Sequence, residues 1–162
     1  MIFVTVGNDF RPFDRFLKKM DEIARRLPDN LVIQTGHSGY RPKNAPHFDF
    51  VSFDEANDHI RKSQLVVSHA GIGTIILCKE YGTPILIFPR RKGYGEHMND
   101  HQMEIAKALE ERGAEDIFVA FEEDRLEEEI QEALKRRKRP VPQKNPGKAD
   151  LIRTIKACIE TP

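Results

Sequence analysis

Short apolar runs alternate with amphipathic stretches along most of this chain. Residues 2–6 are apolar apart from Thr5, which is typical of a strand buried on both faces. Apolar residues then recur every three or four positions from Phe13 to Leu27, which predicts a helix that ends near Pro28. The two patterns repeat. They predict further strands at 31–35, 48–52, 65–68, 85–88 and 117–120, and further helices at 54–62, 74–81, 102–112, 126–134 and 151–159. Asp54 is the expected N-terminal cap of the helix at 54–62, and Gly82 is the expected C-terminal cap of the helix at 74–81.

Strands that are separated by helices indicate βαβ units, which close right-handed into a parallel sheet covered on both faces. We therefore predict an α/β fold, a Rossmann-like doubly wound parallel sheet, in residues 1–134. Residues 135–148 contain three prolines and many cations, and we interpret them as a linker. A C-terminal helix is expected within residues 149–162.

Length and charge narrow the possible functions. The 162 residues suffice for one domain with a short appendage, so we expect no enzyme that needs two full domains in one chain. Lysine plus arginine equal aspartate plus glutamate at 26 each, which argues against a dedicated nucleic-acid binder. The first residues lack a basic n-region and no apolar run approaches 18 residues, so a cytoplasmic protein is expected. Cys78 and Cys158 are predicted to be packed free thiols.

The most informative loop follows the predicted strand at 65–68 and has the sequence Ser-His-Ala-Gly-Ile-Gly-Thr. Gly71 and Gly73 allow close approach of the backbone, and the free N–H groups of the next helix suit a phosphate or diphosphate. Thr74 could cap that helix or donate to the same anion. The alternative is that both glycines only make a tight strand-to-helix turn. The motif is neither a Walker loop nor a complete GxGxxG, because Ile76 occupies the last glycine position.

A second polar loop spans residues 90–102. Glu96, Asp100 and Gln102 offer hydrogen-bonding groups that suit a sugar better than an apolar ligand. The alternative for single residues is that Asp100 or Asn99 caps the next helix and His101 is solvated.

His97 and His101 lie four positions apart, a spacing that can place two metal ligands on one face of a helix. The sequence between them is not a zincin motif and offers no third ligand, so we expect no metal site.

Three other segments have simpler interpretations. The loop at 7–10 follows the first strand and offers further N–H groups, with Asp9 predicted to be an N-cap. The loop at 36–42 is long and polar enough to contact a partner or substrate. Residues 135–139 are five consecutive cations that follow an acidic stretch. The helix dipole favours acidic residues at the start of a helix and basic residues at its end, so we interpret the segment as a solvated helix, with contact to anionic lipid as the alternative.

Taken together, residues 66–74, 82–89 and 96–102 resemble the C-terminal domain of family 28 glycosyltransferases. Residues 3–7 and 36–38 resemble a narrower branch of free-standing small subunits. That branch includes the catalytic subunit of the dolichol-linked UDP-GlcNAc transferase and bacterial exopolysaccharide glycosyltransferase subunits. The resemblance covers about residues 1–120 and rests on the order and spacing of several motifs.

The resemblance implies a domain equivalent to the C-terminal half of a GT-B glycosyltransferase, the half that binds the UDP-sugar donor. By position, it implies that Phe53 sits where the main chain of the family contacts uracil and that Gly7 and Asn8 lie near the phosphates. The complete set of implied substrate-binding residues is Gly7, Asn8, Phe53, His69, Gly71, Ile72, Gly73, Thr74, Glu96, His97, Asp100, His101 and Gln102, of which Glu96, Asp100, His101 and Gln102 would contact the donor sugar.

Two positions depart from the pattern of this family. Leu77 stands where a ribose-binding glutamate is common, and the next acid, Glu80, comes three positions later. Asn8 stands where this branch commonly has a small hydroxyl residue. Loss of the glutamate should weaken UDP binding unless another residue replaces it.

The resemblance therefore implies the donor-binding subunit of a two-component inverting glycosyltransferase. It would use a UDP-sugar without metal or other cofactor and work with a membrane-associated subunit that binds a lipid-diphosphate-linked acceptor. His69 and His101 are the only local candidates for a general base, which the partner could supply instead. A non-catalytic nucleotide-sugar-binding module and an unrelated Rossmann-like enzyme with another phosphate ligand are the alternatives, and a homo-oligomer stays open.

Overall fold

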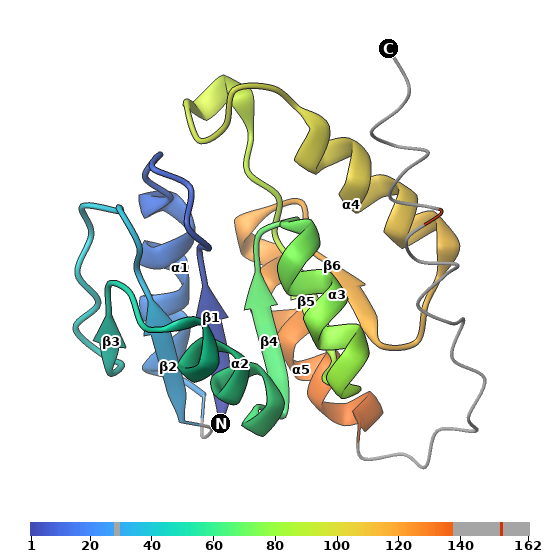
Figure 1. The fold of residues 1–162 in the computed structure, drawn as a ribbon, viewed down its shortest axis with the longest axis horizontal. Helices are drawn as coiled ribbons and strands as arrows, with labels where there is room; N and C mark the ends of the chain where they lie inside the picture. Colours follow the sequence, from blue (N-terminus) through green and yellow to red (C-terminus); the bar gives the residue numbers. More distant parts are fainter. Residues whose placement is uncertain (28–29, 138–152, 154–162) are drawn as a thin grey trace.

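The computed structural model describes residues 1–27, 30–137 and 153. In these ranges six parallel strands form one sheet in the order β3-β2-β1-β4-β5-β6. The predicted α/β fold is confirmed (Figure 1). The strands are β1 (Ile2–Thr5), β2 (Leu31–Gln34), β3 (His47–Phe48), β4 (Leu65–Ser68), β5 (Ile85–Ile87) and β6 (Ile117–Val119), and the helices are α1 (Asp14–Ala24), α2 (Phe53–Lys62), α3 (Ile72–Tyr81), α4 (His101–Arg112) and α5 (Leu126–Arg137), with single 3₁₀ turns at Lys92–Tyr94 and Glu123–Arg125.

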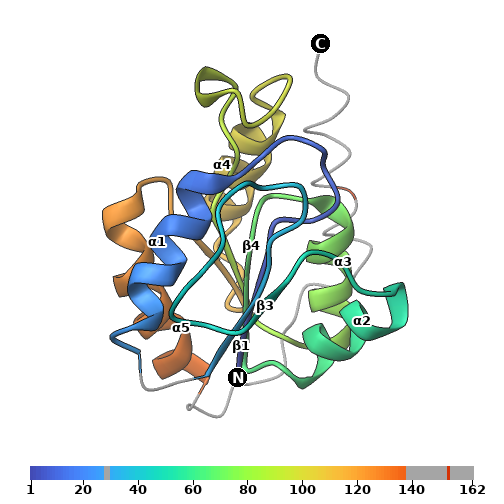
Figure 2. The same ribbon diagram turned by 90° about the vertical axis from the view of Figure 1, so that its left-hand side faces the viewer.

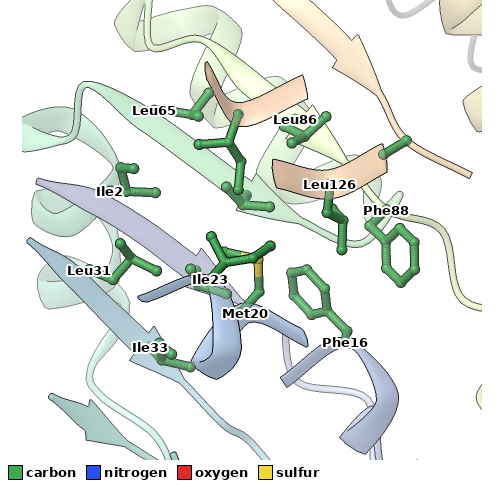
Figure 3. Packing of buried hydrophobic residues seen from close by; sticks show 14 of the residues in the cluster. Ile2, Phe16, Met20, Ile23, Leu31, Ile33, Leu65, Leu86, Phe88 and Leu126 are labelled. Carbon is green, nitrogen blue, oxygen red and sulfur yellow. The ribbon is translucent and has the colours of Figure 1, made fainter. Parts of the chain in front are cut away.

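Helices cover both faces of the sheet, as Figure 2 shows along the sheet edge. Alternate residues of β1 point to opposite faces: Ile2 and Val4 pack with α1 and α5, whereas Phe3 packs with α2, α3 and α4. The first cluster contains Phe16, Met20 and Ile23 from α1 together with strand residues such as Ile33, Leu65 and Leu86, and Figure 3 shows this packing. The central strands are therefore apolar on both sides, as their continuous apolar runs predicted.

Four predicted details of the elements need correction. The strand predicted at 48–52 is reduced to His47–Phe48, because it lies at the sheet edge and Ser52 already turns the chain into α2. Ser52, not Asp54, caps α2. Its hydroxyl accepts from the Glu55 amide while the Glu55 carboxylate accepts from the Ser52 amide. Asp54 lies inside the first turn and cannot reach back in this way.

The other two corrections concern helix starts. Helix α1 begins at Asp14 with Phe13 at the N-cap position, so Asp9 is not its cap. Pro12 keeps Arg11 out of helical geometry, and the Asp9 carboxylate accepts a hydrogen bond from the Arg11 amide instead. Helix α3 begins at Ile72, two residues before the predicted start. Gly82 and Gly113 end α3 and α4 in left-handed conformation, and the Gly82 prediction is thereby confirmed.

The C-terminal predictions are only partly covered. Helix α5 continues to Arg137, three residues into the segment predicted to be a linker. The rest of the predicted linker and almost all of the predicted C-terminal helix lie outside the described residues. Within the described ranges, no helix is long and apolar enough to cross a bilayer.

Candidate functional site

A cavity of about 370 Å³ opens at the carboxyl ends of β1 and β4, where the strand order reverses direction. Ligands of doubly wound sheets bind at this switch point, and the volume lies in the range of small-molecule sites. Its walls come from the β1, β2 and β4 ends and from α2 and α3. The lining residues are Phe3, Thr5, Gly7, Asn8, Gln34, Val51, Phe53, Ala56, Asn57, Ile60, His69, Gly71, Gly73, Thr74 and Leu77.

The loop after β1 is held at the cavity by Gln34. The Gln34 Oε1 atom accepts from the amides of Val6 and Gly7, both at 3.2 Å, and Nε2 donates to the Gly7 carbonyl at 3.0 Å. Gly7 has a φ of 70°, which glycine adopts without strain. Hydrogen bonds from Gln34 at the end of β2 therefore fix the N–H and C=O groups of Gly7. The next residue, Asn8, lines the cavity.

The N-terminus of α3 faces the cavity with no side-chain cap. Gly71 is the N-cap residue and has no side chain, and Thr74 is the third helical residue, where its hydroxyl makes no capping bond. Of the two roles considered for Thr74, that of a helix cap is therefore wrong. The first N–H groups of an α-helix have no partner within the helix and lie at the positive end of its dipole. Together with Gly73 and the Thr74 hydroxyl, they form a site suited to an anion.

His69 fills the space between the two glycine loops. An added Cβ at Gly7 would lie 2.5 Å from its Cε1 atom, and one at Gly71 would lie 2.2 Å from its Nε2 atom. The Ser68 hydroxyl donates to the Thr5 carbonyl at 3.1 Å, so the 3.1 Å contact between Ser68 Oγ and His69 Nδ1 assigns the ring proton to Nδ1. The lone pair is then on Nε2, the ring atom beside Gly71.

Burial, reinforced by the nearby Arg90 guanidinium, lowers the pKa of His69 to about 3. The imidazole is therefore neutral at pH 7. A group with so low a pKa is a weak base, and general bases work best with a pKa near the working pH.

This buried histidine should make folding stability depend on pH. The unfolded chain binds a proton at His69 below about pH 6.5, and the folded chain does so only below about pH 3. The unfolding free energy should therefore fall as the pH is lowered through this window, with a slope that approaches about 1.4 kcal/mol per pH unit from this residue. Urea unfolding between pH 7 and pH 4.5 should show a shallower pH dependence for His69→Gln. Equal slopes for the wild-type protein and His69→Gln would contradict the buried, neutral His69.

Arg90 joins the loops that surround the cavity, although its side chain does not line it. The residue is fully buried, and its guanidinium donates to the carbonyls of Val6 and Arg11, both at 2.9 Å, and of Glu96 at 3.1 Å. It also lies over the Phe13 ring. One cation thus fixes the loop after β1 against the loop after β5.

The loop predicted to contact the donor sugar packs against this scaffold. The Glu96 carboxylate is buried and accepts two hydrogen bonds from Arg15 at 2.8 Å and one from the Arg91 amide at 3.0 Å. Gln102 Oε1 accepts from the Arg90 amide at 3.1 Å. Both side chains therefore support the chain itself, and their contact with a sugar stays a prediction.

The histidine pair does not share a helix face. His101 is the first residue of α4 and pairs with Glu104, whereas His97 precedes the helix and bonds Asn99. The Asp100 carboxylate accepts from the Lys92 amide instead of capping α4. Among the described residues, no three His, Cys, Asp or Glu side chains come together as a metal site would require.

The structure thus brings together about half of the predicted site residues. Gly7, Asn8, Phe53, His69, Gly71, Gly73 and Thr74 line the cavity, whereas Ile72, Glu96, His97, Asp100, His101 and Gln102 do not. His97 approaches the loop after β1, with Nε2 4.0 Å from an Asp9 carboxylate oxygen. Leu77 lines the cavity from α3.

Sequence reasoning missed three polar residues, Gln34, Asn57 and Arg90. Each had a weak signal: Gln34 ends an apolar strand, Asn57 interrupts the apolar face of a helix, and Arg90 begins the polar loop two residues after the predicted strand at 85–88.

A model of the glycosyltransferase family 28 C-terminal domain matches residues 1–156 of this chain. The chain belongs to this family. The resemblance noted from the motifs is thereby confirmed, and it extends beyond residue 120. The cavity at the β1–β4 switch point is therefore the candidate site of a family 28 C-terminal domain.

A curated relative agrees with this assignment. The "UDP-N-acetylglucosamine transferase subunit ALG13" of Homo sapiens is 30% identical over 126 residues, which cover 69% of this chain. The chain spans only about 10% of the length of that relative.

Solved structures share the fold. The NMR solution structure of ALG13 superposes with a TM-score of 0.63 at 19% identity, covering 95% of this chain and 94% of that one. The glycotransferase of kitacinnamycin superposes with a TM-score of 0.62 at 20% identity, covering 97% of this chain but only 39% of that chain. The fold of this chain thus matches one part of the kitacinnamycin glycotransferase and nearly all of the ALG13 structure.

Proposed function

We propose that this chain is the donor-binding, catalytic subunit of a two-component inverting glycosyltransferase. It would transfer a sugar from a UDP-sugar to a lipid-diphosphate-linked acceptor during glycan or polysaccharide assembly. The observation that supports this most is the uncapped N-terminus of α3 in a cavity at the switch point of the sheet, within a family 28 domain. The relative named as a UDP-N-acetylglucosamine transferase subunit supports the same class of donor.

The proposed chemistry follows from the ends of α3 and β1. The diphosphate of the donor would lie against the N–H groups after Gly71 and the hydroxyl of Thr74. When the sugar–phosphate bond breaks, negative charge grows on the departing UDP, and fixed N–H dipoles stabilise that charge without reorganising. We propose that this stabilisation needs no metal ion.

The acceptor and the general base would come from elsewhere. Direct attack by an acceptor hydroxyl needs a group that takes its proton. His69 is a weak base because burial lowers its pKa to about 3, and His101 lies outside the cavity lining. We therefore assign the base to a membrane-associated partner subunit, which would also bring this chain to the cytoplasmic face of the membrane.

Thr74→Val tests the diphosphate assignment. Valine keeps the shape of threonine and removes its hydroxyl, so UDP affinity should fall about tenfold, the effect of one hydrogen bond to a charged group. Isothermal titration calorimetry with UDP measures the change, and uridine, which lacks the phosphates, is the control ligand whose affinity should not change. If the wild-type protein bound no UDP even with its partner, the donor-binding proposal would be overturned.

A non-catalytic module is the second candidate, and Leu77 favours it. This apolar side chain lines the cavity at the position where the family commonly binds ribose with glutamate. Such a module would bind UDP-sugar, yet the complex with the partner would transfer no sugar. A transfer assay on the complex with UDP-GlcNAc, run with and without EDTA, separates the two candidates and also tests the proposed independence from metal.

A further inference from the structure

The Arg15 side chain connects α1 to the loop that follows β5. Its Nε and Nη2 atoms donate to the two carboxylate oxygens of Glu96, both at 2.8 Å, and its Nη1 atom lies 3.6 Å from the Glu123 carboxylate. The guanidinium carbon lies 4.5 Å from the centre of the buried Phe88 ring and 4.9 Å from that of the Tyr94 ring. One side chain of α1 therefore contacts the loop at both Tyr94 and Glu96, and the ring beneath it supports the guanidinium.

The Glu96 carboxylate is already occupied by donors of this chain. Its side chain is only 6% exposed, and it accepts a third hydrogen bond, from the Arg91 amide at 3.0 Å. A sugar hydroxyl would have to displace one of these bonds, and bonds between two charged groups are the strong ones. The carboxylate therefore anchors the loop to α1, and Arg15 is the anchor's other half.

The anchored loop lies beside the proposed diphosphate site. Strand β5 is the neighbour of β4 in the sheet, so the loop after β5 is next to the loop that leads from β4 into α3. Its turn at Lys92–Tyr94 projects beyond the carboxyl ends of the strands (Figure 1). Arg90 also joins it to the loop after β1 through the carbonyls of Val6 and Glu96. A sugar that extends from the start of α3 away from the sheet would thus meet this loop.

We propose that Arg15 is a positioning residue for the sugar of the bound donor. By holding Tyr94 and Glu96, it fixes the loop after β5 in the place where that loop borders the sugar. Glu96 then acts as an anchor instead of making the sugar contact that the resemblance implies. This inference rests on the proposed function, because it takes the diphosphate of a UDP-sugar to lie at the start of α3.

Arg15→Met tests this role, because methionine keeps an unbranched apolar side chain on α1 and removes the guanidinium. Isothermal titration calorimetry should give a UDP affinity within about twofold of wild type and a UDP-GlcNAc affinity that is about tenfold lower. In a transfer assay with the partner, the KM for UDP-GlcNAc should rise by a similar factor, about tenfold. A general loss of structure would instead weaken both ligands alike.

Arg26→Met is the matched control. The Arg26 guanidinium also donates through Nε and Nη2 to one carboxylate, that of Glu127, but this pair is exposed and lies at the other end of α1. The variant should keep the wild-type affinities for both UDP and UDP-GlcNAc.

Glu96→Gln distinguishes an anchor from a direct sugar contact. The amide keeps the size of the carboxylate but has only one acceptor oxygen and no charge. If Glu96 acts through Arg15, the variant with both substitutions should bind UDP-GlcNAc no more weakly than Arg15→Met alone. Losses that multiply in the double variant would assign a separate sugar contact to Glu96 and overturn this inference.

The UDP and UDP-GlcNAc titrations also separate this inference from the proposed function. If Arg15→Met keeps the wild-type affinity for UDP-GlcNAc, or loses affinity for UDP and UDP-GlcNAc equally, the positioning role is overturned while the proposed function stands. No UDP binding by the wild-type protein, even with its partner, would overturn the proposed function itself.

Discussion

Replacing Gly71 with alanine is expected to lower the unfolding free energy by about 2–3 kcal/mol and to weaken UDP binding by about 100-fold. The new Cβ would lie 2.2 Å from Nε2 and 2.7 Å from Cε1 of His69. The ring cannot simply move away, because Gly7 lies against it as well. The start of α3 must therefore shift, and its N–H groups leave the positions in which they face the cavity.

Urea unfolding and UDP calorimetry measure the two effects separately. Gly73→Ala is the matched control for stability, because its Cβ would meet nothing within 4 Å. Alanine is the better helix former, so this variant should gain about 0.5–1 kcal/mol. In the double variant His69→Ala and Gly71→Ala, the removed ring leaves room for the new Cβ. The double variant should therefore lose less unfolding free energy than the two single variants lose when their values are added. Unchanged stability of Gly71→Ala alone would contradict the packing described for His69.

The sheet and the two glycine loops were predictable because they depend on local sequence. A buried parallel strand needs an uninterrupted apolar run, and β4 at Leu65–Ser68 was predicted to the residue. Because the carboxyl ends of parallel strands meet at one sheet edge, the sequence also predicts that the loops containing Gly7 and Gly71 face the same crevice. The error at Asp54 was also local, since the capping pair Ser52 and Glu55 is visible in the sequence.

The polar scaffold of the site was not predictable, because it depends on which loops meet in space. Arg15 and Glu96 are 81 positions apart, yet they form a partly buried bidentate pair. The sequence showed only that Glu96 belongs to a polar loop, and a ligand was the natural explanation for its carboxylate. A partner on α1 explains the same carboxylate without a ligand. A polar side chain in a loop beside a site can therefore either contact a ligand or hydrogen-bond to the protein itself, and only the fold shows which of the two it does.

The same reasoning assigns the largest stability effect to Arg90. In Arg90→Met the side chain keeps its apolar length, but the carbonyls of Val6, Arg11 and Glu96 lose a buried charged donor. Each buried carbonyl left unpaired costs about 1–3 kcal/mol, so the unfolding free energy should fall by about 4 kcal/mol. The midpoint of thermal unfolding should fall by about 10 °C.

Two further variants show whether the loss of stability in Arg90→Met comes from the several N–H donors of the guanidinium group. Arg90→Lys keeps the charge but cannot reach carbonyls on two loops at once, so it should lose about half as much stability as Arg90→Met. Arg61→Met makes the same chemical change at an exposed ion pair with Asp58 and should alter stability by less than about 0.5 kcal/mol. Thermal unfolding of the three variants gives this order. If Arg90→Met melted at the wild-type temperature, the loops after β1 and β5 would have to be held together by other contacts, and Arg90 would not be the residue that sets the shape of the cavity rim.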